Sequence, residues 1–358
     1  MQILKKYFLA SNSCEGFVSA FRDNYDKLDG WRAYIIKGGP GTGKSSFMKK
    51  LAKAAENRGV DTVYCYCSSD PDSLDGVIFK DKKVIVLDGT PPHAIEPELP
   101  GMCENIINLG QCWNSEKLYS NREKIIEATL KNKLIHRTAS SYLLAAGKIF
   151  SDNLSLSSSF VNTKKVSSFA HLLCRKYIHP KKNGEPLESI RFITGITPKG
   201  IVNFTDEINH DYKNKAIISD KYFSVAPIIM ETVRSFAKIC GYEIISIKNS
   251  FMPSAIFDHI LIPELSLAFL TENSFLKFES DTRRIHARRF IDMAAMSKHR
   301  EKRRFNKRLF SELIDEAIFV LKKAKSSHDV LEEYYINSMD FDKLNVMLKD
   351  VEREIFGA

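Results

Sequence analysis

The stretch GGPGTGKS, residues 38–45, decides the fold of this chain of 358 residues. Its spacing, G-x-x-x-x-G-K-[ST], is that of a phosphate-binding P-loop. An apolar run, residues 34–36, precedes it, and residues 47–58, which are rich in helix formers, follow it. Because the motif requires a strand before it and a helix after it, this context strengthens the match. The sequence therefore predicts a strand, a loop and a helix that together bind the phosphates of a nucleotide.

The residue types in the loop suit the chemistry of phosphate binding. Glycine tolerates positive φ and lets backbone N–H groups approach phosphate oxygens, and the next helix adds unpaired N–H groups and its dipole. Lys44 is expected to contact the β- and γ-phosphates, and the Ser45 hydroxyl is expected to bind Mg²⁺. The predicted nucleotide-binding residues are Gly38, Gly39, Pro40, Gly41, Thr42, Gly43, Lys44, Ser45 and Ser46.

An aspartate at the end of a predicted strand completes the expected magnesium site. Residues 84–87 are apolar and Asp88 follows them. P-loop enzymes use an acidic residue on a neighbouring strand to orient magnesium, and ligands bind at the carboxyl ends of parallel strands. We therefore expect Ser45 and Asp88 to hold the metal, with Lys44 and Asp88 as catalytic residues. A plain turn aspartate before Gly89 is the alternative.

Other polar residues of the first half are open to two interpretations. One of Asp70, Asp72 and Asp75 would orient an attacking water or an acceptor hydroxyl, or these residues would only cap a helix and form a turn. His93, in a proline-rich loop, would contact the γ-phosphate or be structural. Candidates for a charge-stabilising finger, among which spacing selects none, are Arg122, Arg137 and Arg175.

The second half of the chain repeats the order of elements found in the first. Residues 8–18 (FLASNSCEGFV) align with residues 192–202 (FITGITPKGIV), and residues 84–87 align with residues 267–270. Regular internal similarity of this kind predicts two copies of one architecture.

The counterpart of the P-loop in the second half lacks the features that bind phosphate. Residues 220–227 read DKYFSVAP, so no glycine remains, and an alanine and a proline stand where the first half has Lys44 and Ser45. β-Branched and aromatic residues do not easily adopt the φ values of the cradle, and proline lacks an N–H group. Thr271 stands in place of Asp88. We therefore predict a second domain that keeps the fold and lacks the nucleotide site.

These features predict an α/β protein: a P-loop NTPase-type parallel sheet flanked by helices, duplicated as two similar domains with helical insertions. We expect residues 1–180 to form the nucleotide-binding domain. Residues 185–358 would form the degenerate P-loop-like domain with a basic helical insertion. The junction falls in residues 151–188, which contain a serine-rich patch and the turn-rich run HPKKNGEP.

The positive charge of the chain is concentrated in one segment. Arg283–Arg308 contains eleven lysine or arginine residues and two acidic residues, so it accounts for the whole formal net charge of +9. Apolar residues at helical spacing within it predict one or two amphipathic helices with a basic face. This face would bind nucleic acid or another polyanion, or would only be solvated; the sequence favours neither.

Cysteine usage and hydropathy predict a cytoplasmic protein. The seven cysteines have no C-x-x-C spacing, and Cys65 and Cys67 read as buried free thiols on a strand rather than as metal ligands. No apolar run approaches membrane-spanning length, and the amino-terminal apolar stretch is too short for a signal peptide. The sequence does not decide whether the protein forms a homo-oligomer.

Four segments, GGPGTGKS, CSSDPDSLDG, VLDGTPPH and ITPKG, resemble a group of poorly characterised bacterial P-loop proteins with two tandem ATPase-like halves. The resemblance covers nearly the whole chain and implies ATP binding and hydrolysis. In that group both halves can carry a P-loop, whereas here only residues 38–45 qualify. VLDGTPPH also resembles the strand-end segment of adenylate-kinase-type enzymes, but the arginine that those kinases place soon after the proline is absent.

The leading hypothesis is an ATP-binding P-loop NTPase that hydrolyses ATP with Mg²⁺ and uses its second half for regulation or partner binding. No [NT]-K-x-D guanine-reading signature occurs, which favours adenine as the base. The first alternative is a nucleotide or small-molecule kinase, with residues 103–137 as an acceptor lid. The second is an ATP-gated adaptor whose basic segment binds nucleic acid.

Overall fold

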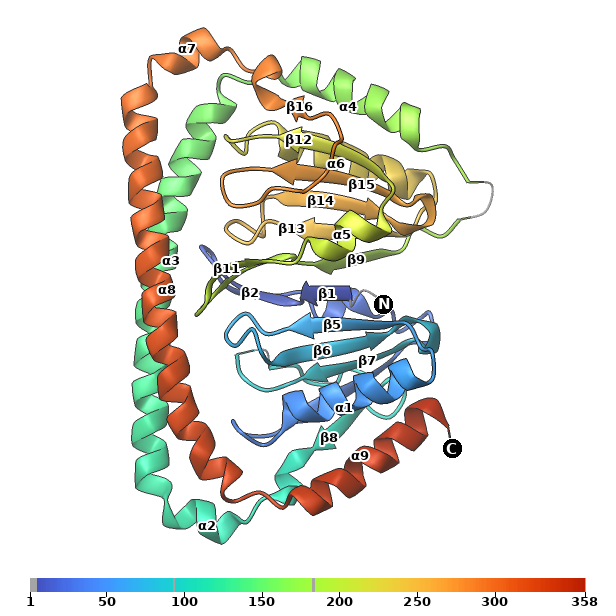
Figure 1. Ribbon diagram of the computed structural model, residues 1–358, viewed down its shortest axis with the longest axis vertical. Helices are drawn as coiled ribbons and strands as arrows, with labels where there is room; N and C mark the ends of the chain where they lie inside the picture. Colours follow the sequence, from blue (N-terminus) through green and yellow to red (C-terminus); the bar gives the residue numbers. More distant parts are fainter. Residues whose placement is uncertain (1–4, 93, 182–183, 358) are drawn as a thin grey trace.

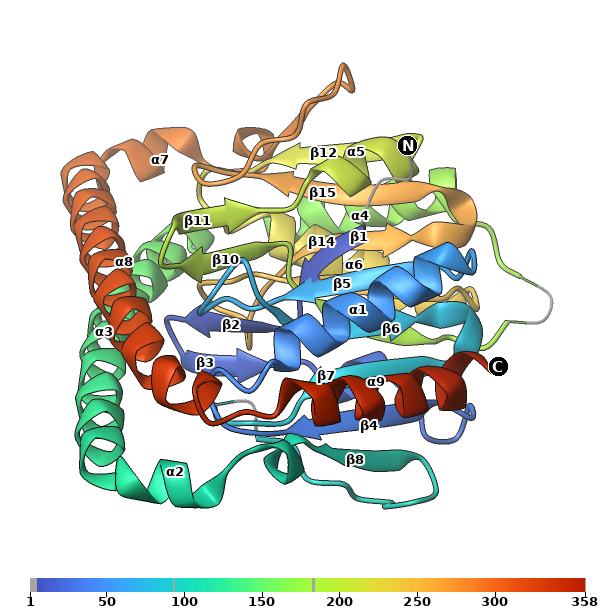
Figure 2. The same ribbon diagram turned by 60° about the horizontal axis from the view of Figure 1, so that its bottom comes forward.

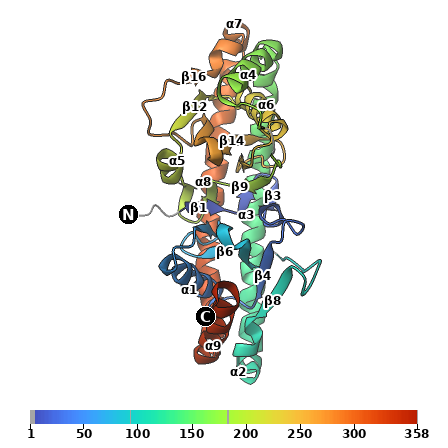
Figure 3. The same ribbon diagram turned by 90° about the vertical axis from the view of Figure 1, so that its right-hand side faces the viewer.

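The computed structural model describes residues 5–92, 94–181 and 184–357. Two six-stranded sheets lie one above the other, and two long helices run along one side of both (Figure 1). Seen from the side, the molecule is long and narrow, with the sheets stacked along these helices (Figure 3). Within the described ranges, no helix has the length and apolar character needed to cross a membrane.

The first sheet has the strand order β1-β5-β6-β7-β4-β8. The bounds of its strands are β1 (Lys5–Phe8), β4 (Arg32–Lys37), β5 (Thr62–Tyr66), β6 (Leu74–Phe79), β7 (Val84–Asp88) and β8 (Glu104–Asn108). Successive residues of a strand point to opposite faces, and both faces of β4 are covered. Tyr34 and Ile36 pack in the cluster with α1 (Lys44–Asn57), whereas Ile35 packs in a core cluster that contains residues of both halves.

The second sheet repeats this succession as β9-β13-β14-β15-β12-β16. Its strands are β9 (Glu188–Arg191), β12 (Asn214–Ser219), β13 (Ile244–Lys248), β14 (Phe257–Ile262), β15 (Leu267–Glu272) and β16 (Ile285–His286). Helix α6 (Ala226–Ile239) follows β12 as α1 follows β4, and the short α5 (Asp206–Asp211) precedes β12. The architecture is thus α/β with two mixed sheets flanked by helices, which is compatible with a duplicated NTPase-like fold.

The expectation of parallel sheets was wrong in one respect, because both sheets are mixed. Strand β6 runs antiparallel to β5 and β7, and β14 runs antiparallel to β13 and β15. Only residues 80–83 separate β6 from β7. A parallel pair needs a crossover of a dozen or more residues, so this short connection imposes a hairpin. The apolar strands of the sequence do not by themselves reveal their direction.

The inner edges of the two sheets meet at a pair of backbone hydrogen bonds. The Phe8 N–H donates to the Phe192 carbonyl over 2.8 Å, and the Phe192 N–H donates to the Phe8 carbonyl over 2.9 Å. Phe8 ends β1, and Phe192 comes directly after β9. These two edge strands face each other in Figure 1. Two hairpins flank the junction: β2 (Ala10–Ser13) with β3 (Gly16–Ser19), and β10 (Thr194–Thr197) with β11 (Gly200–Asn203).

Each half sends a pair of helices across to the other half. The remaining α-helices are α2 (Ser115–Ser120), α3 (Arg122–Ser158), α4 (Thr163–Tyr177), α7 (Met293–Ser297), α8 (Arg300–Ile336) and α9 (Phe341–Phe356), and the 3₁₀ turns are η1 (Arg22–Asn24), η2 (Lys80–Lys82), η3 (Leu109–Cys112), η4 (Pro263–Leu265) and η5 (Ala287–Phe290). Helices α3 and α8 run side by side in opposite directions (Figure 1). As a result α4, from the first half, packs on α6, while α9, from the second half, packs on α1 (Figure 2).

Backbone hydrogen bonds hold both crossing points. The Asn114 N–H donates to the Ser338 carbonyl over 2.8 Å, and the Asp340 N–H donates to the Cys112 carbonyl over 2.7 Å. At the other end of the long helices, Asn162 and Asp292 make the equivalent bonds to Phe290 and Phe160, each over 2.9 Å. The expected domains, residues 1–180 and 185–358, follow chain order, whereas the packing of α4 and α9 crosses that division.

The exchange of helices predicts that the end of the chain stabilises the first sheet. Leu348 on α9 is 7% exposed and lies in the cluster with Phe47 and Leu51 of α1. Leu348→Ala should lower the free energy of unfolding by about 2–4 kcal/mol, because it leaves a cavity in that cluster. Urea denaturation measures the change. Val346→Ala, on the same helix at 60% exposure, is the control and should change stability by less than about 0.5 kcal/mol.

Candidate functional site

Residues 38–45 connect the carboxyl end of β4 to α1. The helix begins at Lys44, and Gly43 precedes it with φ of 87°, while Gly41 has φ of 65°. Both values lie in the left-handed region, which glycine adopts without strain. Gly43 has no side chain with which to cap the helix, so the N–H groups of its first turn are available to an anion.

Lys44 and Asp88 lie close together beside the loop. The Lys44 Nζ donates to the Gly39 carbonyl over 2.8 Å and lies 3.7 Å from the Asp88 Oδ2. The other Asp88 oxygen, Oδ1, accepts hydrogen bonds from the Thr90 N–H and hydroxyl over 2.9 and 2.6 Å. Burial raises the pKa of Asp88, and Asp75 raises it further, while Lys44 lowers it. The pairing with Lys44 therefore favours the charged carboxylate in a site that otherwise disfavours it.

Ser45 contacts the start of β6 at the edge of the sheet where the loop lies. Its Oγ accepts a hydrogen bond from the Leu74 N–H over 2.9 Å. The next residue, Asp75, is buried, and Gly76 pairs with Leu87 across β6 and β7. Because the two strands are antiparallel, Asp75, which precedes Gly76, lies opposite Asp88, which follows Leu87. The structure thus gathers Lys44, Asp88 and Asp75 near the loop, and it places Asp75 in strand β6 rather than in a turn.

Asp70 and Asp72, in contrast, contact lysines of the second half. The Asp70 Oδ2 lies 3.4 Å from the Lys325 Nζ and also accepts from the Ser73 hydroxyl over 2.8 Å. Both oxygens of Asp72 accept from the Lys199 Nζ, over 2.7 and 2.6 Å, and this contact lowers the pKa of Asp72. Lys199 and Lys325 could not be found from the sequence, because only the fold brings β10–β11 and α8 to this loop.

The finger candidates are spread over the long helices. Arg122 and Arg137 lie on α3, and Arg175 lies in the last turn of α4, which packs on the second half. Among the described residues, none of the three forms a hydrogen bond or an ion pair with residues 38–45. His93 lies outside the described residues.

The corresponding loop of the second half is filled by its own carboxylate. The fully buried Asp220 accepts hydrogen bonds from the N–H groups of Tyr222, Val225 and Ala226 over 2.9, 2.8 and 2.9 Å. Two of these donors stand at the beginning of α6, where the first half would bind phosphate. A charged oxygen at a helix start satisfies open N–H groups and the dipole together. The second loop therefore holds an internal anion.

One expectation about this loop needs correction. Aromatic residues were expected to avoid the φ values of a phosphate cradle, yet Phe223 has φ of 58°. Its ring packs against Phe150 of α3 with centroids 4.9 Å apart. Burial of this ring offsets the strain, which is about 1–3 kcal/mol for such a residue.

The cysteines and the basic segment, residues 283–308, lie outside this loop. All seven cysteines are buried and free, and across the described ranges no cluster of three or more His, Cys, Asp or Glu side chains is arranged to hold a metal. The basic segment forms β16, η5, α7 and the start of α8. Arg284 is bound by Glu272 over 2.9 Å and Arg303 stacks over Tyr222. Its exposed basic residues are Arg283, Arg288, Arg289, Lys298, Arg300, Lys302, Arg304, Lys307 and Arg308.

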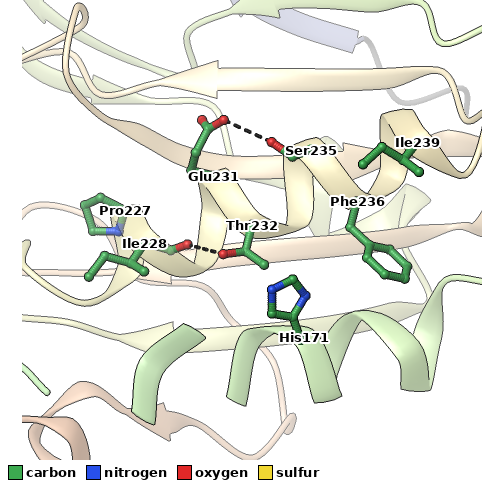
Figure 4. Close-up of a pocket in the computed structure, with 8 residues that line it drawn as sticks. All are labelled: His171, Pro227, Ile228, Glu231, Thr232, Ser235, Phe236 and Ile239. Carbon is green, nitrogen blue, oxygen red and sulfur yellow. Dashed lines mark hydrogen bonds between the residues drawn. The ribbon is translucent and has the colours of Figure 1, made fainter. Parts of the chain in front are cut away.

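An open groove of about 580 Å³ lies elsewhere, between α4 and α6 (Figure 4). Its polar side chains are engaged locally: the Thr232 hydroxyl donates to the Ile228 carbonyl over 2.8 Å, and the Ser235 hydroxyl donates to Glu231 over 3.2 Å. The rest of the lining is mainly apolar. This groove offers no cation for a nucleotide among its lining residues, so the loop at residues 38–45 is the better candidate site.

Comparison with known proteins supports the same region. A family model described as Novel STAND NTPase 3 (nSTAND3) matches residues 18–90. The matched segment runs from β3 to just beyond β7 and includes the loop at residues 38–45 and Asp88. No curated protein and no solved structure matches the chain. At a coarse level the chain is therefore similar to nucleotide-binding NTPases over this segment.

The second half carries a buried aspartate whose ionisation should govern stability against pH. Asp258 is the counterpart of Asp75, and burial raises its pKa to about 7, with Asp220 raising it further and Asn249 lowering it. Between about pH 4 and pH 7 the folded state holds a proton that the unfolded state has lost, so stability falls as pH rises through this range. Asp258→Asn should remove this fall and add on the order of 2–4 kcal/mol at pH 8 relative to pH 4.

Urea denaturation of wild type and Asp258→Asn at pH 4, 6 and 8 tests this expectation. Asp81→Asn, at an exposed position of η2, is the control and should leave the pH dependence unchanged. An equal fall of stability with pH in wild type and Asp258→Asn would contradict the assignment.

Proposed function

We propose that the first half binds ATP with Mg²⁺ and hydrolyses it. The observation that carries the proposal is the arrangement of Lys44 and Asp88 beside an open helix N-terminus, within the segment that matches an NTPase family. Lys44 and the N–H groups of the loop would hold the β- and γ-phosphates and stabilise the charge that develops as water attacks the γ-phosphorus. The bond to the β-phosphate oxygen breaks, and phosphate and ADP leave.

The donor set suits magnesium. The Ser45 hydroxyl and the Asp88 carboxylate are hard oxygen ligands, which Mg²⁺ prefers. The ion would neutralise charge on the phosphate oxygens when bound. Asp75 lies beside Asp88 and would orient water on the ion or act on the attacking water. The second half, whose loop contains Asp220 in place of an external anion, would serve regulation or partner binding.

Replacing Lys44 tests the nucleotide site. Lys44→Ala should weaken binding of a nonhydrolysable Mg·ATP analogue by about tenfold or more and abolish phosphate release, because a charged donor to the phosphates is lost. Calorimetry and a phosphate assay measure these effects. Lys53→Ala, at an exposed position of the same helix, should match wild type. Undiminished hydrolysis by Lys44→Ala would refute the site, and a phosphorylated acceptor in place of free phosphate would favour the kinase alternative.

The exposed basic segment favours a second function, binding of nucleic acid. Most of its basic residues have no carboxylate partner to neutralise them among the described residues, so positive charge is exposed along β16, η5, α7 and the start of α8. Contacts to phosphates release counterions, which makes such binding steeply dependent on salt.

Charge reversal at the start of α8 tests this second function. Arg300→Glu with Arg304→Glu should weaken binding to duplex DNA or to RNA and reduce the slope of log K against log salt by about 2. Filter binding at several salt concentrations measures both. Lys322→Glu with Lys323→Glu carries the same charge change on a different part of α8 and should have little effect. Binding that is absent in wild type or independent of salt would leave this segment without the function.

A further inference from the structure

The carboxyl-terminal turns of α8 lie directly on the P-loop. A Cβ atom added to Gly39 would come within 2.5 Å of the Tyr335 ring, and one added to Gly41 would come within 2.7 Å of the Glu332 carbonyl oxygen. The loop therefore has glycine at these positions partly because α8 approaches so closely. This helix starts beside the second sheet, where Lys302 and Asn306 bind Asp152 of α3.

The side chain of Glu332 reaches a donor that phosphate binding requires. Its carboxylate lies beside the Gly41 N–H, and this backbone donor helps to lower the pKa of Glu332. The His328 Nε2 lies 3.5 Å from the Glu332 Oε1, and Lys325 lies one turn further along the same face of α8. The contact with His328 lowers the pKa of Glu332 most, so the side chain is ionised at neutral pH. An anion of the chain thus lies beside one of the N–H groups of the cradle.

The two loops of the protein differ in where their internal anion comes from. In the second half, Asp220 is part of the loop itself and is fully buried, so it cannot leave without unfolding its surroundings. In the first half, Glu332 belongs to a different element and is only half-buried. Its contact can break while the loop and α1 stay folded.

We propose that Glu332 is a built-in competitor for the terminal phosphate of the nucleotide: its carboxylate takes the Gly41 N–H in the free protein, and binding of a triphosphate displaces the end of α8. This inference rests on the proposed nucleotide site. The Glu332 carboxylate and the terminal phosphate are both negative and would compete for the one hydrogen of the Gly41 N–H. They repel each other, so both cannot occupy the cradle. Because Tyr335 and the Glu332 backbone also lie against Gly39 and Gly41, the displacement involves the helix end rather than one side chain.

This arrangement couples the site to the other half of the chain. Helix α8 is one continuous helix from Arg300 to Ile336, and its first turns belong to the basic segment beside the second sheet. Anything that draws α8 away from the loop would therefore assist nucleotide binding, and nucleotide binding would in turn act on α8, since linkage is reciprocal.

Neutralising the competitor tests the inference. Glu332→Gln should bind a nonhydrolysable Mg·ATP analogue about three- to tenfold more tightly than wild type in calorimetry, because a repelling charge is removed. ADP, which lacks the terminal phosphate, should gain clearly less. Glu333→Gln, the exposed neighbour on the same helix, is the matched control and should behave as wild type. Equal or weaker binding of the analogue by Glu332→Gln would overturn the inference.

Hydrogen exchange on the wild-type protein gives a second measurement that needs no variant. Addition of the Mg·ATP analogue should speed amide exchange at residues 328–340 while it slows exchange at residues 38–45. Slower exchange at both segments would mean that α8 closes on the nucleotide, and it would overturn the inference. If the analogue binds and Lys44→Ala abolishes binding, a null result with Glu332→Gln refutes this inference alone. Failure of wild type and Glu332→Gln to bind the analogue refutes the proposed function as well.

Discussion

The open amino terminus of a helix that follows a tight loop is the constraint on which both halves of this protein depend. The first-turn N–H groups of α1 and α6 have no partner within their own helices and carry a partial positive charge, so each needs an anion. The second half supplies it from the loop, through Asp220, and the glycines become unnecessary. The first half keeps a glycine-rich loop, and the carboxylate beside its Gly41 N–H, that of Glu332, belongs to α8. One requirement with two solutions explains why the halves share an architecture and differ in chemistry.

The sequence was a good guide to the parts of this structure that are local. The strand, loop and helix around residues 38–45 follow from glycine spacing and apolar runs, and Asp88 at the end of β7 follows from the same local pattern. The mixed sheets were missed because apolar strands that are covered on both faces look alike in either direction; the four-residue connection from Phe79 to Val84 was the available signal. The role of Asp220 was also missed, because the comparison of halves counted lost glycines and not a gained carboxylate.

Contacts between distant segments were beyond the reach of the sequence. Glu332, Lys325 and Lys199 meet the first half only because α8 and the β10–β11 hairpin cross to it. An amphipathic pattern shows that a helix buries one face, but not which sheet or helix it covers. The pattern of α9 is equally compatible with packing on α6, the nearer helix in sequence, and the structure instead places it on α1.

The exchange of α4 and α9 between the halves also bears on how the chain is made. Translation delivers β4, the glycine-rich loop and α1 early, while α9, which packs beside α1 in the same apolar cluster, emerges only after the whole second half. Until then the part of α1 that α9 covers remains exposed on the ribosome, and exposed apolar surface favours aggregation. Folding of the first half is thereby tied to completion of the second, and a nascent chain halted midway would hold the phosphate loop without the helices that enclose it.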